Sequence, residues 1–132
     1  FNRPTIYNKI QIKDLLQYKS NKTIKLEKIA NKKVYLFSAL GDNESFKKIM
    51  DNTGAKIVGH SKYPDHYEYT FEDLKDIEQK AKKCNAEFLI TTEKDLVKIN
   101  SQYNKIDIYA ARMKMLFKPE NLFSEYIEDL LS

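Results

Sequence analysis

The sequence predicts an α/β fold, in which a three-layer α/β/α arrangement with a small, mainly parallel sheet is preceded by a two-stranded β linker. From residue 33 onward, segments of strand length alternate with amphipathic segments of helix length. Residues 34–39 form the continuous apolar run expected of a strand that is covered on both faces. Repeated strand–helix–strand units favour parallel strands that are joined by right-handed crossovers.

The first 32 residues have a different pattern. Residues 5–12 alternate between apolar and polar side chains with the period of two that is typical of a half-buried strand. Residues 23–28 share this pattern, and the polar stretch 19–22 between them suits a turn. We therefore expect a two-stranded ribbon, which is marginally stable alone and needs another surface to lie on.

The remaining elements follow from apolar spacing and from helix start and stop signals. A helix at 44–52 ends before Gly54, and a later helix opens at Thr70, where Asp73 completes an acidic variant of the capping box. The last helix begins near Pro119, which suits a first helical turn. The other predicted elements are strands at 55–59, 87–91 and 106–110 and a short helix at 93–99.

Length and composition are those of a globular domain. The 132 residues have room for one domain with a hydrophobic core, and 42% of them are hydrophobic and 32% charged. No apolar run approaches the roughly 18 residues of a membrane-spanning helix. The lone Cys84 excludes an internal disulfide and fits a reducing compartment. Because the chain starts at Phe1, without a methionine or a signal peptide, we expect it to be part of a longer protein.

Charge is distributed unevenly along the chain. Residues 1–62 carry 13 Lys and Arg against 5 Asp and Glu, a net charge of +8, whereas residues 63–132 carry 10 against 14, a net charge of −4. A basic excess can steer a protein toward nucleic acid, anionic lipid or phosphate. Only Arg3 and Arg112 offer the bidentate guanidinium that base and phosphate readout favours, so we expect no dedicated nucleic-acid surface.

Three segments fall at the carboxyl ends of predicted strands, where the ligands of such sheets gather: residues 38–43, 60–69 and 91–95. In the first segment, Gly41 permits a tight turn, and exposed amides at a helix start can hold an anion. Asp42 and Glu44 already supply negative charge at that helix end. On the residues alone, an N-capped turn without a ligand is the simpler interpretation.

The second segment contains Tyr63-Pro-Asp-His-Tyr-Glu-Tyr69, an acid and an imidazole among three phenols. The imidazole of His66 is able to accept or relay a proton near neutral pH, with Asp65 as its neighbour. The alternative is a surface loop whose tyrosines pack over the sheet. No metal site is predicted, because His60 and His66 lack a third ligand at helical spacing and Cys84 is isolated.

The third segment, Thr91-Thr-Glu-Lys-Asp95, follows a strand and opens a helix. Thr92 can cap this helix, while Glu93 and Asp95 complement its positive end. Lys94 is able to contact a phosphate or to pair with an acid. A structural role accounts for most of this segment, and its functional signal comes from its position at a strand end.

Together, the three segments resemble the tetraacyldisaccharide 4'-kinase family of lipid A biosynthesis. The family typically has a Gly-Ile-Gly-Asn-Pro-like turn, a Phe-Pro-Asp-His-His-like loop and a Thr-Thr-Glu-Lys-Asp strand end. This chain has Ala39-Leu-Gly-Asp-Asn-Glu-Ser-Phe46, the 63–69 segment and Thr91-Thr-Glu-Lys-Asp-Leu-Val-Lys98 in the same order. It departs from the family pattern where Ala39 and Asn43 replace a Gly and a Pro and where Tyr67 replaces a second His.

The resemblance implies a two-domain, membrane-associated kinase at the cytoplasmic face of the bacterial inner membrane. Such an enzyme moves the γ-phosphate of ATP, with Mg²⁺, to the 4'-hydroxyl of a tetraacyldisaccharide 1-phosphate. The family's phosphate-binding loop, Mg²⁺-binding acids and proposed catalytic Asp belong to an amino-terminal domain. Here the resemblance implies an interdomain linker at 1–32 and a carboxy-terminal α/β domain at 33–132, which holds no cofactor and is inactive alone.

The resemblance also implies roles for particular residues. The motif His is carried to His66 as a catalytic residue that partners the Asp of the other domain, with Asp65 in support. Cofactor-binding positions at the strand ends are Gly41, Thr92, Glu93, Lys94 and Asp95. The implied partners are the amino-terminal P-loop domain, the lipid A disaccharide precursor and an anionic membrane surface, with no nucleic acid. The alternative is a small basic α/β module that binds nucleic acid or another protein.

Overall fold

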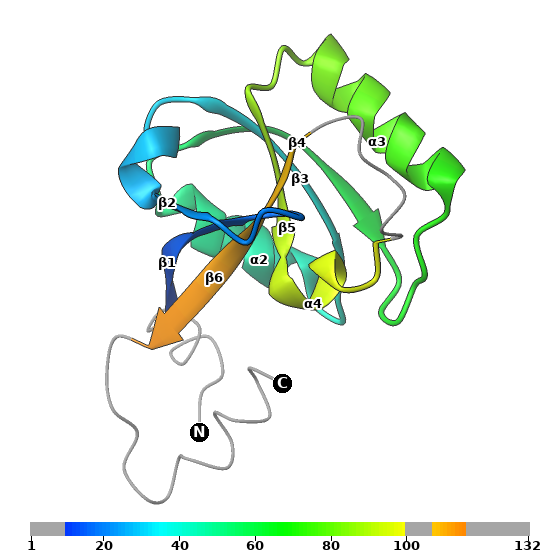
Figure 1. Ribbon diagram of the computed structural model, residues 1–132, viewed down its shortest axis with the longest axis horizontal. Coiled ribbons are helices and arrows are strands. Elements are labelled where there is room, and N and C mark those ends of the chain that lie inside the picture. Colours follow the sequence, from blue (N-terminus) through cyan, green and yellow to red (C-terminus); the bar gives the residue numbers. More distant parts are fainter. Residues whose placement is uncertain (1–9, 100–106, 116–132) are drawn as a thin grey trace, which may run out of the picture.

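The computed structural model describes residues 10–99 and 107–115, which form one six-stranded sheet with helices on both faces (Figure 1). The strands lie in the spatial order β2-β1-β6-β5-β3-β4. Their bounds are β1 Ile10–Gln17, β2 Thr23–Lys25, β3 Lys33–Ala39, β4 Lys56–Tyr63, β5 Phe88–Thr92 and β6 Ile108–Met115. The helices are the 3-10 helix η1 (Leu26–Ile29) and the α-helices α2 (Asn43–Asp51), α3 (Phe71–Lys83) and α4 (Glu93–Leu96).

The centre of the sheet is parallel. β6, β5, β3 and β4 run in one direction, and β1 and β2 are antiparallel to their neighbours. α2 connects β3 to β4, and α3 connects β4 to β5, so each crossover joins two parallel strands. The predicted mainly parallel α/β fold is therefore confirmed.

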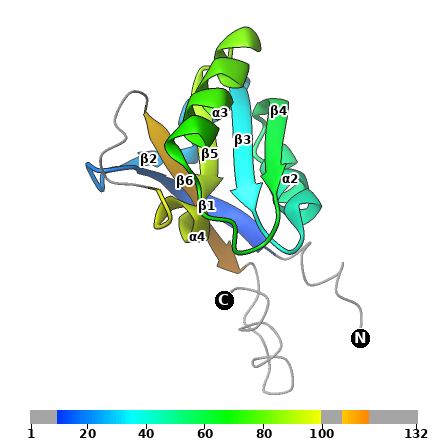
Figure 2. The ribbon, with the colours of Figure 1, turned by 90° about the vertical axis from the view of Figure 1, so that its right-hand side faces the viewer.

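Alternate side chains of β3 divide the core between the two faces of the sheet. Val34 and Leu36 pack with Phe46 of α2, while Phe37 and Ala39 pack on the opposite face with residues of α3. Figure 2 shows α2 and α3 on opposite sides of the strands. Because β3 is buried on both faces, its sequence lacks the alternation of a half-exposed strand.

Local capping defines where the two longer helices begin. Thr70 accepts a hydrogen bond from the backbone N–H of Asp73, and the Asp73 side chain accepts one from the N–H of Thr70, as the sequence predicts. Asp42 caps α2 by accepting a hydrogen bond from the N–H of Ser45. The predicted helix at 93–99 is shorter, because α4 ends at Leu96.

The predicted ribbon is part of the sheet. β1 pairs with β6 from Ile10 opposite Met115 to Gln17 opposite Tyr109, and β2 pairs with β1. β1 therefore extends beyond the predicted end at residue 12, while residues 5–9 lie outside the described residues. The chain leaves the predicted strand 23–28 at Lys25 and forms η1, which buries Ile29 in the core.

Two other strands are longer than predicted. β4 continues to Tyr63 instead of ending at 59, and β6 continues to Met115 instead of 110. In both, polar residues interrupt the apolar pattern while strand pairing continues. The predicted carboxy-terminal helix at Pro119 lies outside the described residues. Among the described residues, no helix is long and apolar enough to cross a membrane.

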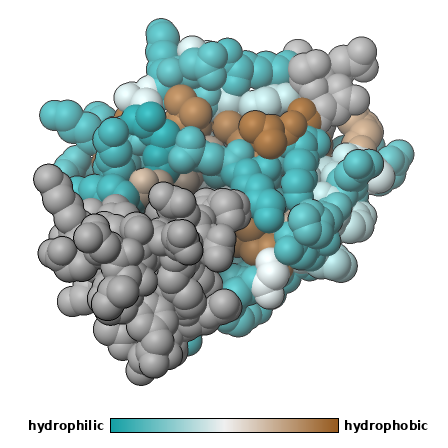
Figure 3. Space-filling model, turned by 90° about the horizontal axis from the view of Figure 1, so that it is seen from below, coloured by the Kyte–Doolittle hydropathy of each residue, from teal (hydrophilic) through white to brown (hydrophobic). Residues whose placement is uncertain are grey.

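The carboxyl ends of the parallel strands lie at one edge of the sheet. In Figure 2 the arrowheads of β3, β4, β5 and β6 all point downward to this edge. Figure 3 views the molecule from that side, where hydrophobic patches interrupt a largely hydrophilic surface. The turns that follow β3, β4 and β5 therefore meet at this place, which we call the carboxyl edge.

Candidate functional site

The turns after β3, β4 and β5 bring three of the sequence-predicted residues together at the carboxyl edge. The Oδ2 atom of Asp65 lies 3.6 Å from where a Cβ of Gly41 would stand. The Oδ1 atom of Asp65 accepts a hydrogen bond from Lys94 Nζ at 3.3 Å. All three residues are exposed. Segments that are up to 53 positions apart thus form one polar cluster around Asp65.

His66 lies in a tight turn after β4. The N–H of Tyr67 donates to the carbonyl of Pro64 at 3.1 Å, and His66 has a positive φ of 65°. This resembles a type II turn, whose third residue needs a left-handed conformation, and His adopts that conformation more readily than most residues. The His66 side chain is 83% exposed, and its Nε2 atom lies 3.6 Å from Asp65 Oδ2. The adjacent Asp and His therefore face each other and the solvent.

Tyrosines hold the base of this turn. The rings of Tyr63 and Tyr67 stack with 4.7 Å between centroids, and the Tyr67 hydroxyl donates to Asp73 at 2.7 Å. Tyr69 is buried edge-on against Phe37. The segment therefore has both features considered from the sequence: its tyrosines pack over the sheet, and its His stays exposed.

The surroundings lower the pKa of Asp65 and raise the pKa values of Tyr63 and Tyr69. Loss of water around Asp65 opposes ionisation, but the hydrogen bond and charge of Lys94 outweigh it and lower the pKa of this carboxyl. Burial, with smaller contributions from Asp73 and other neighbours, raises the pKa of Tyr63 to about 12. Burial followed by the charge of Asp95 also raises the pKa of Tyr69. Both phenols therefore stay protonated at neutral pH, and the Tyr69 hydroxyl acts as a hydrogen-bond donor.

Thr91 and Asp95 complete the hydrogen bonding of β3 where β5 leaves it. The last paired residues of β3 and β5 are Leu36 and Ile90. Beyond them, the Thr91 hydroxyl donates to the carbonyl of Phe37 at 2.7 Å. The carboxylate of Asp95, which is 0% exposed, then accepts the N–H of Ala39 at 3.0 Å. Side chains of β5 and α4 thus replace the backbone partners that β3 loses.

The Asp95 carboxylate has two further donors. The Tyr69 hydroxyl donates to Oδ1 at 3.1 Å, and the Thr92 hydroxyl donates to Oδ2 at 2.6 Å. Thr92 also caps α4 by accepting the N–H of Asp95. Of the predicted cofactor-binding residues, the structure places Thr92 and Asp95 in the interior and Gly41, Glu93 and Lys94 on the surface.

Sequence reasoning missed a second polar group beneath the carboxyl edge. Ser38 Oγ lies 2.7 Å from both Asn43 Oδ1 and His60 Nε2, and the Asn43 amide reaches the carbonyl of Tyr63. From the sequence, His60 is a candidate only for metal binding. His60 lies on another strand, 22 positions from Ser38, so no local spacing could have indicated this contact.

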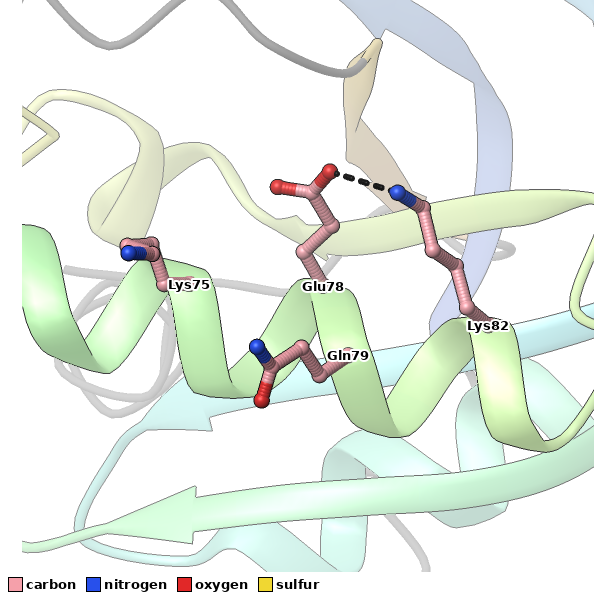
Figure 4. A pocket seen from close by; sticks show the side chains of 4 residues that line it. All are labelled: Lys75, Glu78, Gln79 and Lys82. Carbon is pink, nitrogen blue, oxygen red and sulfur yellow. Dashed lines mark ion pairs between the residues drawn. The ribbon is translucent and has the colours of Figure 1, made fainter.

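Two other kinds of site are not supported by the described residues. Residues 10–99 and 107–115 contain no group of three or more His, Cys, Asp and Glu side chains that could hold a metal ion. A hollow on α3, lined by Lys75, Glu78, Gln79 and Lys82, is formed by one helix face (Figure 4). Its Glu78–Lys82 ion pair is an ordinary pair one turn apart.

Open α/β sheets bind their ligands outside the carboxyl ends of parallel strands, and this chain is an α/β domain of that class. Its exposed polar cluster lies at that edge. The family model described as tetraacyldisaccharide-1-P 4'-kinase matches residues 2–132, and the chain belongs to this family.

Individual relatives agree with this membership. The tetraacyldisaccharide 4'-kinase of Syntrophus aciditrophicus is 31% identical over 119 residues, which are 89% of this chain and 32% of the relative. That of Rickettsia bellii is 38% identical over 114 residues, 82% of this chain and 35% of the relative. The chain thus spans about a third of the length of these relatives. The family resemblance of the three motifs is confirmed.

A solved structure supports the fold. The crystal structure of LpxK from Aquifex aeolicus in complex with ATP covers 92% of this chain with a TM-score of 0.52 and 24% sequence identity. The match includes 34% of that protein. It shows that this α/β architecture also occurs in an experimentally determined member of the family.

Removal of the Asp95 carboxylate should destabilise the fold. Asp95→Ala leaves the buried N–H of Ala39 and the Tyr69 hydroxyl without an acceptor, and we expect a loss of about 3 kcal/mol in the free energy of unfolding. Asp95→Asn keeps an acceptor and should lose about 1–2 kcal/mol through the missing charge. Urea unfolding followed by circular dichroism measures both values.

The matched control is Asp51→Ala, which removes an exposed carboxylate paired with Lys47 at 3.3 Å. It should change the free energy of unfolding by about 0.5 kcal/mol or less. Equal losses in the Asp51 and Asp95 variants would contradict the structural role of the buried carboxylate.

The stability of the fold should fall as His60 is forced to bind a proton. Burial, followed by the nearby Lys62, lowers the pKa of His60 from 6.5 to about 4. As the pH falls, the unfolded chain therefore binds this proton before the folded chain does. The contribution of neutral His60 to the free energy of unfolding is fully present above pH 6.5 and is lost as the pH falls toward about 4. We expect a loss of less than about 1.4 kcal/mol per pH unit within this window, because solvent around the partly exposed imidazole screens its interactions.

Urea unfolding at several pH values from 7.5 to about 4 tests this prediction. His60→Gln should reduce the pH dependence, whereas His66→Asn, at an exposed site, should leave it unchanged. Carboxylates also titrate in this range, but they do so in all three proteins. An undiminished pH dependence in His60→Gln would show that His60 does not cause it.

Proposed function

We propose that this chain is the carboxy-terminal part of a kinase that transfers the γ-phosphate of ATP to the 4'-hydroxyl of a tetraacyldisaccharide 1-phosphate in lipid A biosynthesis. The observation that carries this proposal is the meeting of the three family motifs at the carboxyl edge, around Asp65. Family membership agrees with it. The ATP in the Aquifex aeolicus LpxK structure supports ATP as the phosphate donor.

We infer that the phosphate-binding loop belongs to another part of the complete protein. Phosphoryl transfer depends on a cradle of backbone amides, a Lys and Mg²⁺. Residues Gly54 to Gly59 have the glycine spacing of such a loop, but His60 follows where a Lys is needed. Gly59 also lies within β4, where the Tyr35 ring occupies the position that a Cβ atom would take. The chain therefore supplies one side of the site.

Mg²⁺ binding is likewise inferred to depend on the rest of the protein. Mg²⁺ takes oxygen ligands, usually one or two carboxylates together with substrate phosphates. At the carboxyl edge, Asp65 is paired with Lys94 and Asp95 is enclosed by three donors. These carboxylates are engaged by protein groups, so the residues described here do not fit a Mg²⁺ site.

We propose that His66 is the catalytic residue contributed by this chain. Its exposed imidazole is able to reach a group of an opposing domain, and the turn holds its backbone in one conformation. Paired with a catalytic Asp of the amino-terminal domain, it would orient that base and favour its ionised form. Asp65 supports the imidazole from 3.6 Å.

We choose the residues that contact the nucleotide by their exposure to solvent. Gly41, Glu93 and Lys94 are exposed at the carboxyl edge, and we propose them as contacts to ATP. Thr92 and Asp95 are buried and hydrogen-bonded, so their part in cofactor binding is to shape the turn that presents Lys94. Lys94 has the charge to meet a phosphate, in exchange for its contact with Asp65.

We infer that residues 33–132 form the carboxy-terminal domain and that 1–32 connect it to the amino-terminal P-loop domain, with β1 and β2 held in the sheet. The lipid substrate places the enzyme at the cytoplasmic face of the inner membrane. The net charge of +8 on residues 1–62 suits an anionic membrane surface or nucleotide phosphates, and no nucleic acid is required.

The chain alone should not phosphorylate the lipid precursor. With [γ-³²P]ATP, Mg²⁺ and a tetraacyldisaccharide 1-phosphate, we expect no product above background, because the chain lacks a phosphate-binding loop. The complete protein from the same source is the positive control. Turnover by the chain alone would contradict the division of the site between two domains, and inactive complete protein would contradict the assigned reaction.

Loss of the His66 imidazole should lower turnover in the complete enzyme. His66→Asn preserves a residue type that tolerates the positive φ at this position, so the turn remains. We expect kcat to fall about 10²- to 10⁴-fold, as for loss of acid–base assistance. Glu68→Gln changes an exposed side chain of the same segment and should retain activity. Wild-type turnover in His66→Asn would remove this imidazole from the mechanism.

A further inference from the structure

We propose that Asn43 is a positioning residue that ties the Gly41 turn to the His66 turn, and that Ser38 and His60 hold its side chain in place. The catalytic consequence rests on the proposed function, in which His66 acts in phosphoryl transfer. The structural link itself does not depend on that function. It joins two turns that follow neighbouring strands at the carboxyl edge.

The Asn43 side chain has three hydrogen bonds to different parts of the edge. Its Oδ1 atom accepts the N–H of Leu40 at 3.0 Å and the hydroxyl of Ser38 at 2.7 Å. Its Nδ2 atom donates to the carbonyl of Tyr63 at 3.0 Å. Two donors meet the oxygen and one acceptor meets the nitrogen, so the surroundings fix the orientation of the amide.

Ser38 and His60 continue this link below the edge. The single hydroxyl proton of Ser38 is directed to Asn43 Oδ1, which cannot donate. The contact of 2.7 Å between Ser38 Oγ and His60 Nε2 must then be donated by the imidazole. This assigns the neutral Nε2–H tautomer to His60. Its Nδ1 atom is buried without a hydrogen-bond partner, and a lone pair is tolerated there better than a charged N–H.

The position of Asn43 explains why the link matters. Pairing between β3 and β4 ends with Ala39 opposite Tyr63, and the Asn43 hydrogen bonds begin at that point. On one strand they hold Leu40, which precedes Gly41, and on the other they hold Tyr63, which precedes the turn of His66. One side chain thus connects the residues that precede both turns.

A simple helix-capping role does not account for these contacts. Asn43 is the first residue of α2, but the side chain of Asp42 caps this helix through the N–H of Ser45. The exposed ion pair of Lys62 with Glu44 also joins β4 to α2. Such pairs contribute little because water competes for them. The partly buried hydrogen bonds of Asn43 are less exposed to this competition and form the more rigid connection.

Two variants separate the parts of the link. Asn43→Asp keeps an oxygen toward Leu40 and Ser38 but presents a second oxygen to the carbonyl of Tyr63, so it breaks the connection to the His66 turn. Ser38→Ala removes the contact with His60 and leaves the other Asn43 partners. Thr53→Val is the matched control. Thr53 lies beyond the other end of α2, and the substitution removes its side-chain hydrogen bond to the carbonyl of Met50.

The structural arm of the test uses NMR on the ¹⁵N-labelled chain, with no kinase assay. We expect His60 to show the Nε2–H tautomer in the wild-type chain at neutral pH. Residual dipolar couplings should report a changed His66 N–H orientation in Asn43→Asp and no change in Thr53→Val. An Nδ1–H tautomer, or an unchanged His66 orientation in Asn43→Asp, would overturn the proposal.

The catalytic arm uses the complete enzyme. Misplacement of a reacting group by about 1 Å can cost on the order of 100-fold in rate, so Asn43→Asp should lower kcat about 10- to 100-fold, with Ser38→Ala smaller. The KM for the lipid substrate should change by about 2-fold or less. Thr53→Val should retain wild-type kcat. Full kcat in Asn43→Asp would overturn the positioning role, whereas an inactive wild-type enzyme would contradict the proposed function and leave the NMR result standing.

Discussion

The arrangement of the carboxyl edge depends on the buried carboxylate of Asp95. β3 and β5 separate after Leu36 and Ile90, which would leave backbone groups of β3 buried without partners. Asp95 accepts the N–H of Ala39 and, at the same time, the hydroxyl of Tyr69. It therefore closes the gap between the two strands and attaches the segment that follows β4. The carboxylate thus supplies a hydrogen-bond partner where β3 and β5 no longer pair.

The edge is held from both faces of the sheet, and each face uses a different device. On the α3 face Asp95 binds Ala39, and on the α2 face Asn43 binds Leu40 and Tyr63. The end of β3 thus lies between two sets of hydrogen bonds that use successive residues. Polar groups of this kind favour one arrangement because each alternative leaves a buried donor or acceptor unpaired. The interior is consequently well defined, while the residues that point outward are exposed.

Local patterns predicted the elements, but contacts between distant segments decided their roles. The apolar run of β3 and the capping box of Thr70 with Asp73 are readable because each lies within a few neighbouring positions. The pairing of β1 with β6 joins residues about 100 positions apart, and nothing in the alternation of β1 identifies that partner. For the same reason, the sequence, in which the family resemblance implies a cofactor contact for Asp95, does not show the structural partners of this carboxylate. Its partner Ala39 is 56 positions away, and only the structure shows that the carboxylate is enclosed.

The contrast between a fixed backbone and an exposed imidazole defines what this domain can and cannot contribute. The turn of His66 is closed by a backbone hydrogen bond and flanked by the stacked rings of Tyr63 and Tyr67, so its geometry is set before any ligand arrives. The His66 side chain nevertheless stands in water, where charge–charge interactions are weak. An opposing surface that excludes water would strengthen the interaction of the imidazole with a carboxylate without moving the turn. On the proposed function, this chain therefore supplies position, and the electrostatic environment for chemistry would come from an opposing surface of the complete protein.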